Sequence, residues 1–381
     1  MRKNSQWIML ASALLAAGAT GAAAPTNGGP TNPGSPDRAP TNRQPTTSGP
    51  LAPLFRAGEG ETRAALMIRD GRVVAKRYSP GYSDANRFIS WSMAKTVTAI
   101  LVGELVADGR LALDAPAPIA EWRGANDPRH AITLRMLLTM SSGLQHTEVG
   151  DPVEASDTNQ VLFVSGTQAM AARAIGKPLE ARPGAKFEYS SLTTIILAEI
   201  ITRTLTSSAD PRIRARAYRD FAAQRLFGPA GITSARLEFD GAGTQIGGSL
   251  IYMTLDDYGR LGQVLLAGKG PDGAQIVAPD WLAFMTTPSP DNPEYGGQLW
   301  LNRAGGVDPH PALFPGHGPA TLVSCLGHLG QFVIASPDQN LVLVRLGKTQ
   351  DDTAAFSALR TAIGQVVERV PVGAPVRGAG A

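Results

Sequence analysis

The chain has 381 residues, of which 43% are hydrophobic and 18% charged, a balance that excludes both a disordered chain and a bundle of membrane helices. Its formal net charge of +3 includes Arg2 and Lys3, and without these two the count is 33 basic against 32 acidic side chains, which gives no reason to expect a nucleic-acid partner. Cys325 is the only cysteine, so no intramolecular disulfide forms, and its apolar surroundings (321–326) indicate a buried structural thiol.

The first 24 residues have the layout of a secretory signal peptide, with Arg2 and Lys3, an apolar stretch (7–17) and small residues ending in three alanines. The apolar stretch is about half of the ~20 residues that a membrane-spanning helix needs, so we expect no stable membrane insertion after cleavage. Residues 25–50 are rich in Pro, Gly, Thr and Asn and indicate a disordered spacer. The protein is therefore expected to be exported, either periplasmic or secreted.

The folded domain is predicted over residues 51–370, followed by a flexible tail (371–381). Two β-like runs, 64–68 and 73–75, flank Asp70-Gly71, a dipeptide typical of a hairpin turn. We therefore predict a β-hairpin at the start of the domain.

A helix follows, because Val97, Ile100, Leu101 and Leu105 recur at spacings of three and four and Asp108-Gly109 supplies a stop. Ser92 lies at its entrance, and Lys95 comes three residues later, within reach of the Ser92 hydroxyl. A neutral lysine can take the proton of a serine, and the positive end of the helix dipole disfavours the ammonium form. The pair predicts a nucleophile beside its base, although Ser-x-x-Lys alone is also compatible with a simple serine N-cap.

The middle of the chain reads as helices and long loops. Residues 133–140 and 194–203 are helical stretches, and a Pro-Gly turn (183–184) precedes Tyr189-Ser190-Ser191. A further helix (254–262) is expected to be capped by Thr254.

The last hundred residues return to strands, at 322–326, 331–335 and 341–346, before an amphipathic helix carrying Phe356, Leu359, Ile363, Val366 and Val367. Strands at both ends with helices between them predict an α+β fold, in which one antiparallel sheet is built from both chain ends, is flanked by helices and accommodates an inserted, mostly helical domain.

Three motifs stand in order: Ser92-Met93-Ala94-Lys95, Tyr189-Ser190-Ser191 and His328-Leu329-Gly330. This order resembles the serine β-lactamase and penicillin-binding superfamily. The phrases LRMLLTMSSGL (134–144), PGAKFEYSS (183–191), GGSLIYMTLDD (247–257) and GHLGQFVIASP (327–337) are similar to its class C-like branch, nearest to 6-aminohexanoate-dimer hydrolases and β-lactamase-like carboxylesterases.

The resemblance implies that Ser92 is acylated, that Lys95 shares or accepts its proton, and that Tyr189 acts as general base and later protonates the leaving group. The backbone amides of Ser92 and Gln331 would form the oxyanion hole. Ser191, His328 and Gly330 would contact the substrate. It implies no metal and no organic cofactor, and a small ester, amide or short peptide-like substrate.

Two positions depart from the pattern. Ser191 replaces an asparagine, and His328 replaces a lysine and is expected to be largely neutral at pH 7. Both changes weaken the expectation of efficient β-lactam hydrolysis. The alternatives are a D,D-peptidase-like enzyme, a weak class C-type β-lactamase and a non-catalytic penicillin-binding protein. Acyl and amine specificity depends on residues 144–182 and 291–320, which the sequence does not place in space, and the oligomeric state is equally open.

Other hydrolase classes fit less well. An α/β-hydrolase would need a Gly-x-Ser-x-Gly pentapeptide, which the chain lacks. A class A β-lactamase would need a glutamate-centred loop, and Glu154 lacks the spacing to an asparagine. His310 and His317 lie seven residues apart but belong to no His-Glu-x-x-His motif, so a zinc hydrolase is disfavoured.

Overall fold

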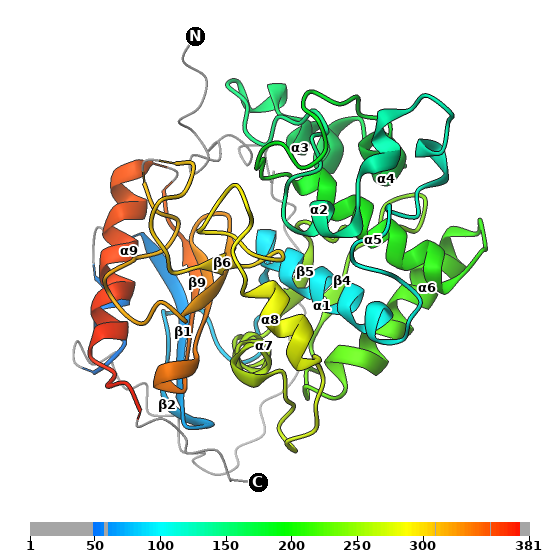
Figure 1. Cartoon of the computed structure of the whole chain (residues 1–381). Coiled ribbons are helices and arrows are strands. Elements are labelled where there is room, and N and C mark those ends of the chain that lie inside the picture. Colours follow the sequence, from blue (N-terminus) through cyan, green and yellow to red (C-terminus); the bar gives the residue numbers. More distant parts are fainter. Residues whose placement is uncertain (1–48, 57–59, 309, 351, 374–381) are drawn as a thin grey trace, which may run out of the picture.

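The computed structural model describes residues 49–56, 60–308, 310–350 and 352–373 (Figure 1). The predicted signal peptide (1–24), nearly all of the predicted spacer (25–50) and the end of the predicted tail lie outside these residues. Within the described ranges, no helix combines the length and the apolar character that crossing a membrane requires.

A six-stranded antiparallel sheet joins the two ends of the chain. Its strand order is β2 (Arg72–Tyr78), β1 (Glu61–Arg69), β9 (Leu341–Lys348), β8 (Gln331–Ser336), β7 (Val323–Gly327) and β6 (Trp300–Leu301). The predicted hairpin is confirmed, because β1 pairs with β2 across Asp70 and Gly71, whose φ angles of 51° and 74° fit a tight hairpin turn. The predicted α+β class is likewise confirmed.

A hydrophobic core lies on each face of the sheet, as the residues of β1 show, because successive side chains of a strand point to opposite faces. On β1, Ala64, Leu66 and Ile68 belong to the larger core, which the sheet shares with the helical part of the molecule. Ala65 and Met67 belong to a smaller core under α9 (Thr353–Glu368). Figure 1 shows α9 on one side of the sheet and the other helices on the opposite side.

The helical part is built around α1 (Ala94–Ala107) and α5 (Ser191–Leu205), which pack against each other. A three-stranded sheet of β3 (Phe88–Ile89), β5 (Ile251–Met253) and β4 (Arg236–Leu237) lies beside them. The other helices of the described ranges are α2 (Leu134–Leu138), α3 (Asp157–Asn159), α4 (Met170–Ile175), α6 (Pro211–Ala222), α7 (Leu255–Ala267) and α8 (Pro279–Met285). Thr254 caps α7 as predicted, since its hydroxyl accepts the N–H of Asp257.

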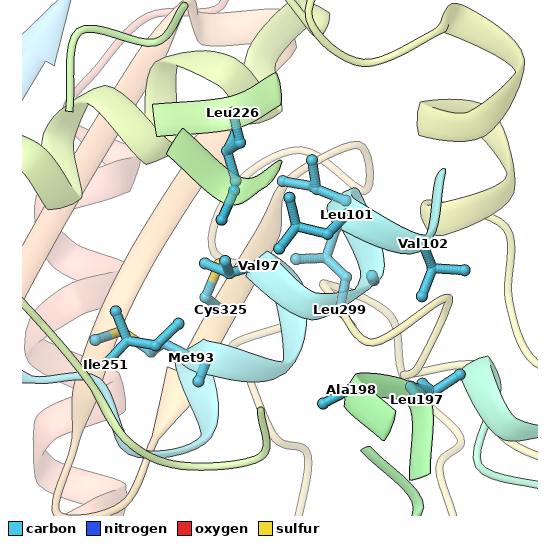
Figure 2. Packing of buried hydrophobic residues seen from close by; sticks show 14 of the residues in the cluster. Met93, Val97, Leu101, Val102, Leu197, Ala198, Leu226, Ile251, Leu299 and Cys325 are labelled. Carbon is cyan, nitrogen blue, oxygen red and sulfur yellow. The ribbon is translucent and has the colours of Figure 1, made fainter. Parts of the chain in front are cut away.

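The surroundings of α1 differ from the prediction. The apolar spacing predicted one buried face, but every residue from Ala94 to Leu105 is buried, including Lys95 and Glu104. Figure 2 shows why: Val97 and Val102 of α1, and Met93 just before it, lie in a core to which the strands and the neighbouring helices both contribute. A helix enclosed on all sides carries its polar residues inward, where they need partners.

Cys325 lies in this core, next to the sheet end of α1 (Figure 2). It is 1% exposed and is a free thiol. Burial raises the pKa of Cys325 to about 12, so the thiol stays protonated at physiological pH. This agrees with a structural thiol.

Candidate active site

Ser92 lies in η2 (Trp91–Met93), a single 3-10 turn directly before α1. The preceding residue, Trp91, has a φ of 44°, a conformation that residues with side chains seldom adopt. Ser90 ties the turn to the neighbouring strand: its N–H donates to Ile251 O (2.7 Å) and its hydroxyl donates to Ser249 O (3.0 Å). Because such strain persists only where the surroundings enforce it, the fold fixes the position of Ser92.

Lys95 connects three segments of the chain. Its Nζ donates to Ser92 Oγ, to Ser191 Oγ and to Gly248 O, each at 2.9 Å. The side chain is almost entirely buried, at 2% exposure. Glycine is needed at position 248, because a Cβ there would lie 2.9 Å from Ser191 O. Ser92 and Lys95, three residues apart in the sequence, therefore lie within hydrogen-bond distance. In the ammonium form of Lys95, each of the three protons has an acceptor.

The ionisation of Lys95 follows from these surroundings. Burial lowers its pKa to about 8, against the opposing negative charge of Glu148. The partners that it touches are two hydroxyls and a carbonyl, none of which carries a charge. With a pKa of about 8, roughly one molecule in ten holds a neutral lysine at pH 7. Lys95 is thus available as a base next to Ser92.

Tyr189 reaches the same point from the segment before α5. Its ring stacks on Trp300 (5.7 Å between centroids) and meets Tyr295 edge-on (5.8 Å). Lys95 Nζ lies 4.8 Å from the ring centroid. Burial and the charge of Glu148 raise the pKa of Tyr189 by more than its hydrogen bond with Ser92 lowers it. Tyr189 is therefore a phenol, and hence a proton donor, at neutral pH.

The third motif forms the turn between β7 and β8, so β8 begins after it, at Gln331. Leu329 and Gly330 have φ angles of 60° and 78°. Arg345 Nη1 holds the turn from behind, donating to Gly330 O (2.7 Å) and Leu329 O (3.2 Å). In a trans peptide the carbonyl and the following N–H point in opposite directions, so the N–H of Gln331 points away from Arg345.

This turn packs against the Ser92 turn. The η2 segment contacts both β7 and β8. Gly327, at the end of β7, allows the approach, because a Cβ at this position would lie 2.5 Å from Ser90 O. The amides of Ser92 and Gln331 are thus carried by two segments in contact. Their joint role as an oxyanion hole stays a prediction.

His328 lines the pocket in front of Ser92 and meets Trp91 edge-on, with 5.1 Å between ring centroids. Burial lowers its pKa to about 4, against the opposing charge of Glu148. Its Nδ1 is buried and has no hydrogen-bond partner within the described part of the chain. His328 is therefore neutral at pH 7, as expected from the sequence.

Ser191, expected to contact substrate, lies behind Lys95 at 1% exposure. Its hydroxyl accepts from Lys95 and donates to Glu148 Oε1 at 2.6 Å. The Ser191 hydroxyl thus lies between a lysine and a carboxylate, and its contact with the substrate stays a prediction.

Glu148 was missed by the sequence analysis. It is 5% exposed and lies in the segment 144–182, which the sequence did not place. The sequence carried no signal for it, because Gln145, His146, Thr147 and Glu148 are all polar, and only the structure shows that His146 and Glu148 are buried while Gln145 and Thr147 are exposed, as in an extended segment. That alternation points two ionisable side chains inward but names no partner for them.

A pocket lined in part by Ser92 opens in front of this serine. Phe187, Tyr189 and Trp300 give it an aromatic wall. Glu294, Asp308 and Arg360 also line the pocket and bring charged groups to it. No group of three or more His, Cys, Asp or Glu side chains that could hold a metal ion occurs in the described ranges.

Known proteins are similar to this chain in sequence and in fold. The chain is 26% identical over 331 residues to an uncharacterized protein of Mycobacterium tuberculosis, covering 71% of this chain and 79% of that protein. It is 22% identical over 338 residues to the 6-aminohexanoate-dimer hydrolase of Paenarthrobacter ureafaciens, covering 81% and 78%.

Among solved structures, a Bacillus anthracis protein that carries the name 6-aminohexanoate-dimer hydrolase superposes with a TM-score of 0.63 at 21% identity, covering 82% of this chain and 81% of that one. The sequence profile of the family described as Beta-lactamase matches residues 54–368, most of the chain. With the order of motifs and the geometry around Ser92, this match shows that the chain belongs to the Beta-lactamase family.

Proposed function

We propose that the protein hydrolyses small amides or esters through an acyl-enzyme on Ser92. The observation that carries this proposal is the buried contact of 2.9 Å between Lys95 Nζ and Ser92 Oγ. A serine hydroxyl becomes a strong nucleophile only when a base takes its proton. Lys95, whose pKa burial lowers to about 8, is such a base.

In the acylation step, neutral Lys95 takes the proton of Ser92 as Oγ bonds to the substrate carbonyl carbon. Negative charge develops on the carbonyl oxygen, where the N–H groups of Ser92 and Gln331 would stabilise it. Each such donor contributes about 3 to 4 kcal/mol to transition-state stabilisation. Arg345 donates a hydrogen bond to Gly330 O and so fixes the orientation of the peptide group between Gly330 and Gln331, which supports this role for the Gln331 N–H.

The bond to the leaving nitrogen or oxygen then breaks, and that atom needs a proton. Tyr189 is suited to donate it, since its raised pKa keeps the phenol protonated and it bonds with Ser92. The proton held by Lys95 replaces the one that Tyr189 gives. Water then attacks the acyl carbon by the reverse sequence and releases Ser92. The prediction from sequence let Lys95 share or accept the proton of Ser92 and made Tyr189 the general base, and we propose Lys95 as the base of the acylation step.

The substrate class follows from the pocket and from the relatives. The aromatic wall of Phe187, Tyr189 and Trp300 suits an apolar chain beside the carbonyl group. The relative from Paenarthrobacter ureafaciens is named for hydrolysis of the 6-aminohexanoate dimer. We therefore favour linear amides, with small esters as more reactive surrogates, over β-lactams.

The test is intact mass of the protein after brief exposure to p-nitrophenyl butyrate and, separately, to a β-lactam, with product release followed in parallel. We compare wild type with Ser92→Ala, and with Ser207→Ala, which removes an exposed hydroxyl after α5 as a matched control. We expect ester turnover and a transient butyryl adduct in wild type and Ser207→Ala, and neither in Ser92→Ala.

Other outcomes would decide between the alternatives. A lasting β-lactam adduct without ester turnover would support the alternative of a penicillin-binding protein. Rapid β-lactam turnover would support a β-lactamase. Absence of any adduct from both reagents would contradict the assignment of Ser92.

We also propose that the protein is exported, from the basic, apolar and small-residue order of residues 1–24. Expression in a bacterium followed by cell fractionation and N-terminal sequencing tests this. Cleavage near residue 24 with the product outside the cytoplasm is expected, and an intact N-terminus in the cytoplasm would contradict it.

A further inference from the structure

Glu148 has four hydrogen-bond donors around one buried carboxylate. Oε2 accepts from the N–H of Ser191 (2.8 Å) and the Thr158 hydroxyl (2.8 Å) and lies 2.6 Å from His146 Nε2. Oε1 accepts from the Ser191 hydroxyl (2.6 Å). The residue does not line the pocket, so it reaches the reacting atoms only through others.

The carboxylate stays ionised despite its burial. Burial acts to raise the pKa of Glu148, but the bond with His146, the charge of Lys95 and the bond with Ser191 together lower it to about 2. The position of Glu148 at the N-terminus of α5 also favours the anion, because the Ser191 N–H has no partner within the helix and donates to Glu148, and because the helix dipole is positive at this end. At working pH, Glu148 therefore accepts hydrogen bonds and donates none.

The ionised carboxylate of Glu148 fixes the direction of the hydrogen bond between Ser191 and Lys95. A serine hydroxyl has one proton, and Ser191 gives it to Glu148. Toward Lys95, Ser191 therefore presents only lone pairs. Gly248 O, the other rear partner of Lys95, is a carbonyl and also only accepts. Two acceptors thus face Lys95 from behind, and Ser92 faces it from the front.

A neutral amine has two N–H bonds and one lone pair. The two rear acceptors take both N–H bonds, which leaves the lone pair directed at Ser92, the remaining partner and one that can donate. We propose that Glu148 is a positioning residue that commits the proton of Ser191 and so aims the lone pair of Lys95 at Ser92. The inference rests on the proposed function, in which Lys95 is the base.

Without the Glu148 carboxylate, the hydrogen bond between Ser191 and Lys95 can reverse its direction. A glutamine at position 148 offers N–H groups to Ser191, whose proton is then free to occupy the lone pair of Lys95. The amine remains in place but faces the wrong way. A buried carboxylate that sets the tautomer of a catalytic histidine acts by the same logic, and its loss there lowers kcat about 10⁴-fold.

Several titratable groups bear on the pH dependence. Tyr189, from the segment before α5, lies against Lys95, and the charge of Glu148 acts on Lys95. His146 from the extended segment bonds to Glu148, and His328 from the β7–β8 turn is influenced by the Glu148 charge. Glu148 raises the pKa of Lys95, Tyr189 and His328 alike. Removing its charge therefore lowers the pKa of all three, and the acid limb of the pH profile moves to lower pH.

The experiment measures kcat and KM for p-nitrophenyl butyrate against pH in wild type and Glu148→Gln. We expect the plateau kcat to fall by at least about tenfold, with KM little changed, while the acid limb moves to lower pH. Glu199→Gln is the matched control, since Glu199 is equally buried but bonds to Arg203, Arg214 and Thr244. It should leave the limb in place.

Variants of Ser191 test the same point without touching Glu148. Ser191→Ala removes the hydroxyl and should lower kcat about as much as Glu148→Gln, and the double variant should be no worse than either single one. Ser191→Asn restores the direction of the bonds, because its amide N–H donates toward Glu148 and its oxygen accepts from Lys95. It should recover most of the activity lost in Ser191→Ala.

The outcomes separate this inference from the proposed function. If wild type turns over the ester and Glu148→Gln has an unchanged profile, or loses kcat with its acid limb unmoved, the positioning role is wrong and the acyl-enzyme stands. Equal activity of Ser191→Ala and Ser191→Asn would overturn it as well, even if Glu148→Gln fails to fold. Absence of turnover in wild type would instead contradict the proposed function.

Discussion

Two lysines of this chain meet carboxylates in different ways. Lys76, on β2, pairs directly with Asp84 and Asp256, at 2.8 Å from Asp256. Burial acts to lower the pKa of Lys76, but the two carboxylates outweigh it and the pKa is raised. Lys95 is more deeply buried, and its carboxylate, Glu148, lies one hydroxyl away. There burial prevails, and the pKa falls to about 8.

The difference lies in what separates amine from acid. Direct contact with Asp84 and Asp256 keeps Lys76, on the edge strand β2, positively charged. With Ser191 interposed, Lys95 keeps a positive charge to balance Glu148 at low pH and loses its proton as the pH rises through about 8. The same two kinds of side chain thus give a structural pair in one place and a base in the other.

The sharpest test of this comparison replaces each lysine with methionine, an unbranched side chain that keeps most of the length but not the amine. Lys95→Met should lower kcat for p-nitrophenyl butyrate by about 10³-fold or more, because Ser92 loses its base. Lys76→Met should leave kcat within about twofold of wild type. Steady-state kinetics decide the matter, and similar losses in both variants would remove the distinction.

The phenol of Tyr189 is the next largest contribution. Tyr189→Phe should lower kcat about 100-fold, since a general acid contributes 10²-fold or more. Tyr295→Phe is its control, because Tyr295 lies in the same aromatic cluster at 1% exposure. The loss of kcat should be larger for a linear amide substrate, whose leaving nitrogen needs the proton, than for the p-nitrophenyl ester. Equal losses for the two substrates would speak against a role in leaving-group protonation.

The pH dependence follows from the lowered pKa of Lys95. The neutral amine is the active form, so kcat/KM should rise about tenfold per pH unit below an apparent pKa of about 8 and level off above it. His328 does not shape this limb, because its pKa is lowered to about 4. A stopped-time assay from pH 5.5 to 9.5 measures the curve, and a flat profile across that range would exclude a titrating lysine as the base.

The sequence predicts those parts of the site that are local in the chain. Ser92 and Lys95 lie three residues apart at the start of one helix, and Asp70-Gly71 specifies its hairpin by turn chemistry alone. Tyr189 is predicted because its motif falls in family order.

Glu148 is of another kind. Its bond to the Ser191 hydroxyl joins positions 43 residues apart, and no periodicity encodes which loop folds against the end of α5. The full enclosure of α1 is likewise decided by its neighbours, so the apolar stripe of Val97 and Leu101 captured one face of a helix that is buried on every face.

The smallest expected effect is on stability. Lys76→Met should lower the free energy of unfolding by under about 1 kcal/mol at pH 7, because the side chains of Lys76 and Asp84 are 24% and 70% exposed and water screens the pair. Lys269→Met, at an exposed lysine, is the control.

The sign of the pH effect sharpens this prediction. The pKa of Lys76 is raised on folding, so its contribution is full below the unfolded pKa and is lost as pH rises through the folded one. The pKa of Asp84 is lowered, so its contribution is present above the unfolded pKa and is lost as pH falls through the folded one. Urea unfolding should therefore show a constant difference between wild type and Lys76→Met near neutrality that narrows at both extremes. A difference above about 2 kcal/mol would mean that the pair on β2 behaves as a buried one, and the contrast with Lys95 would then rest on Ser191 alone.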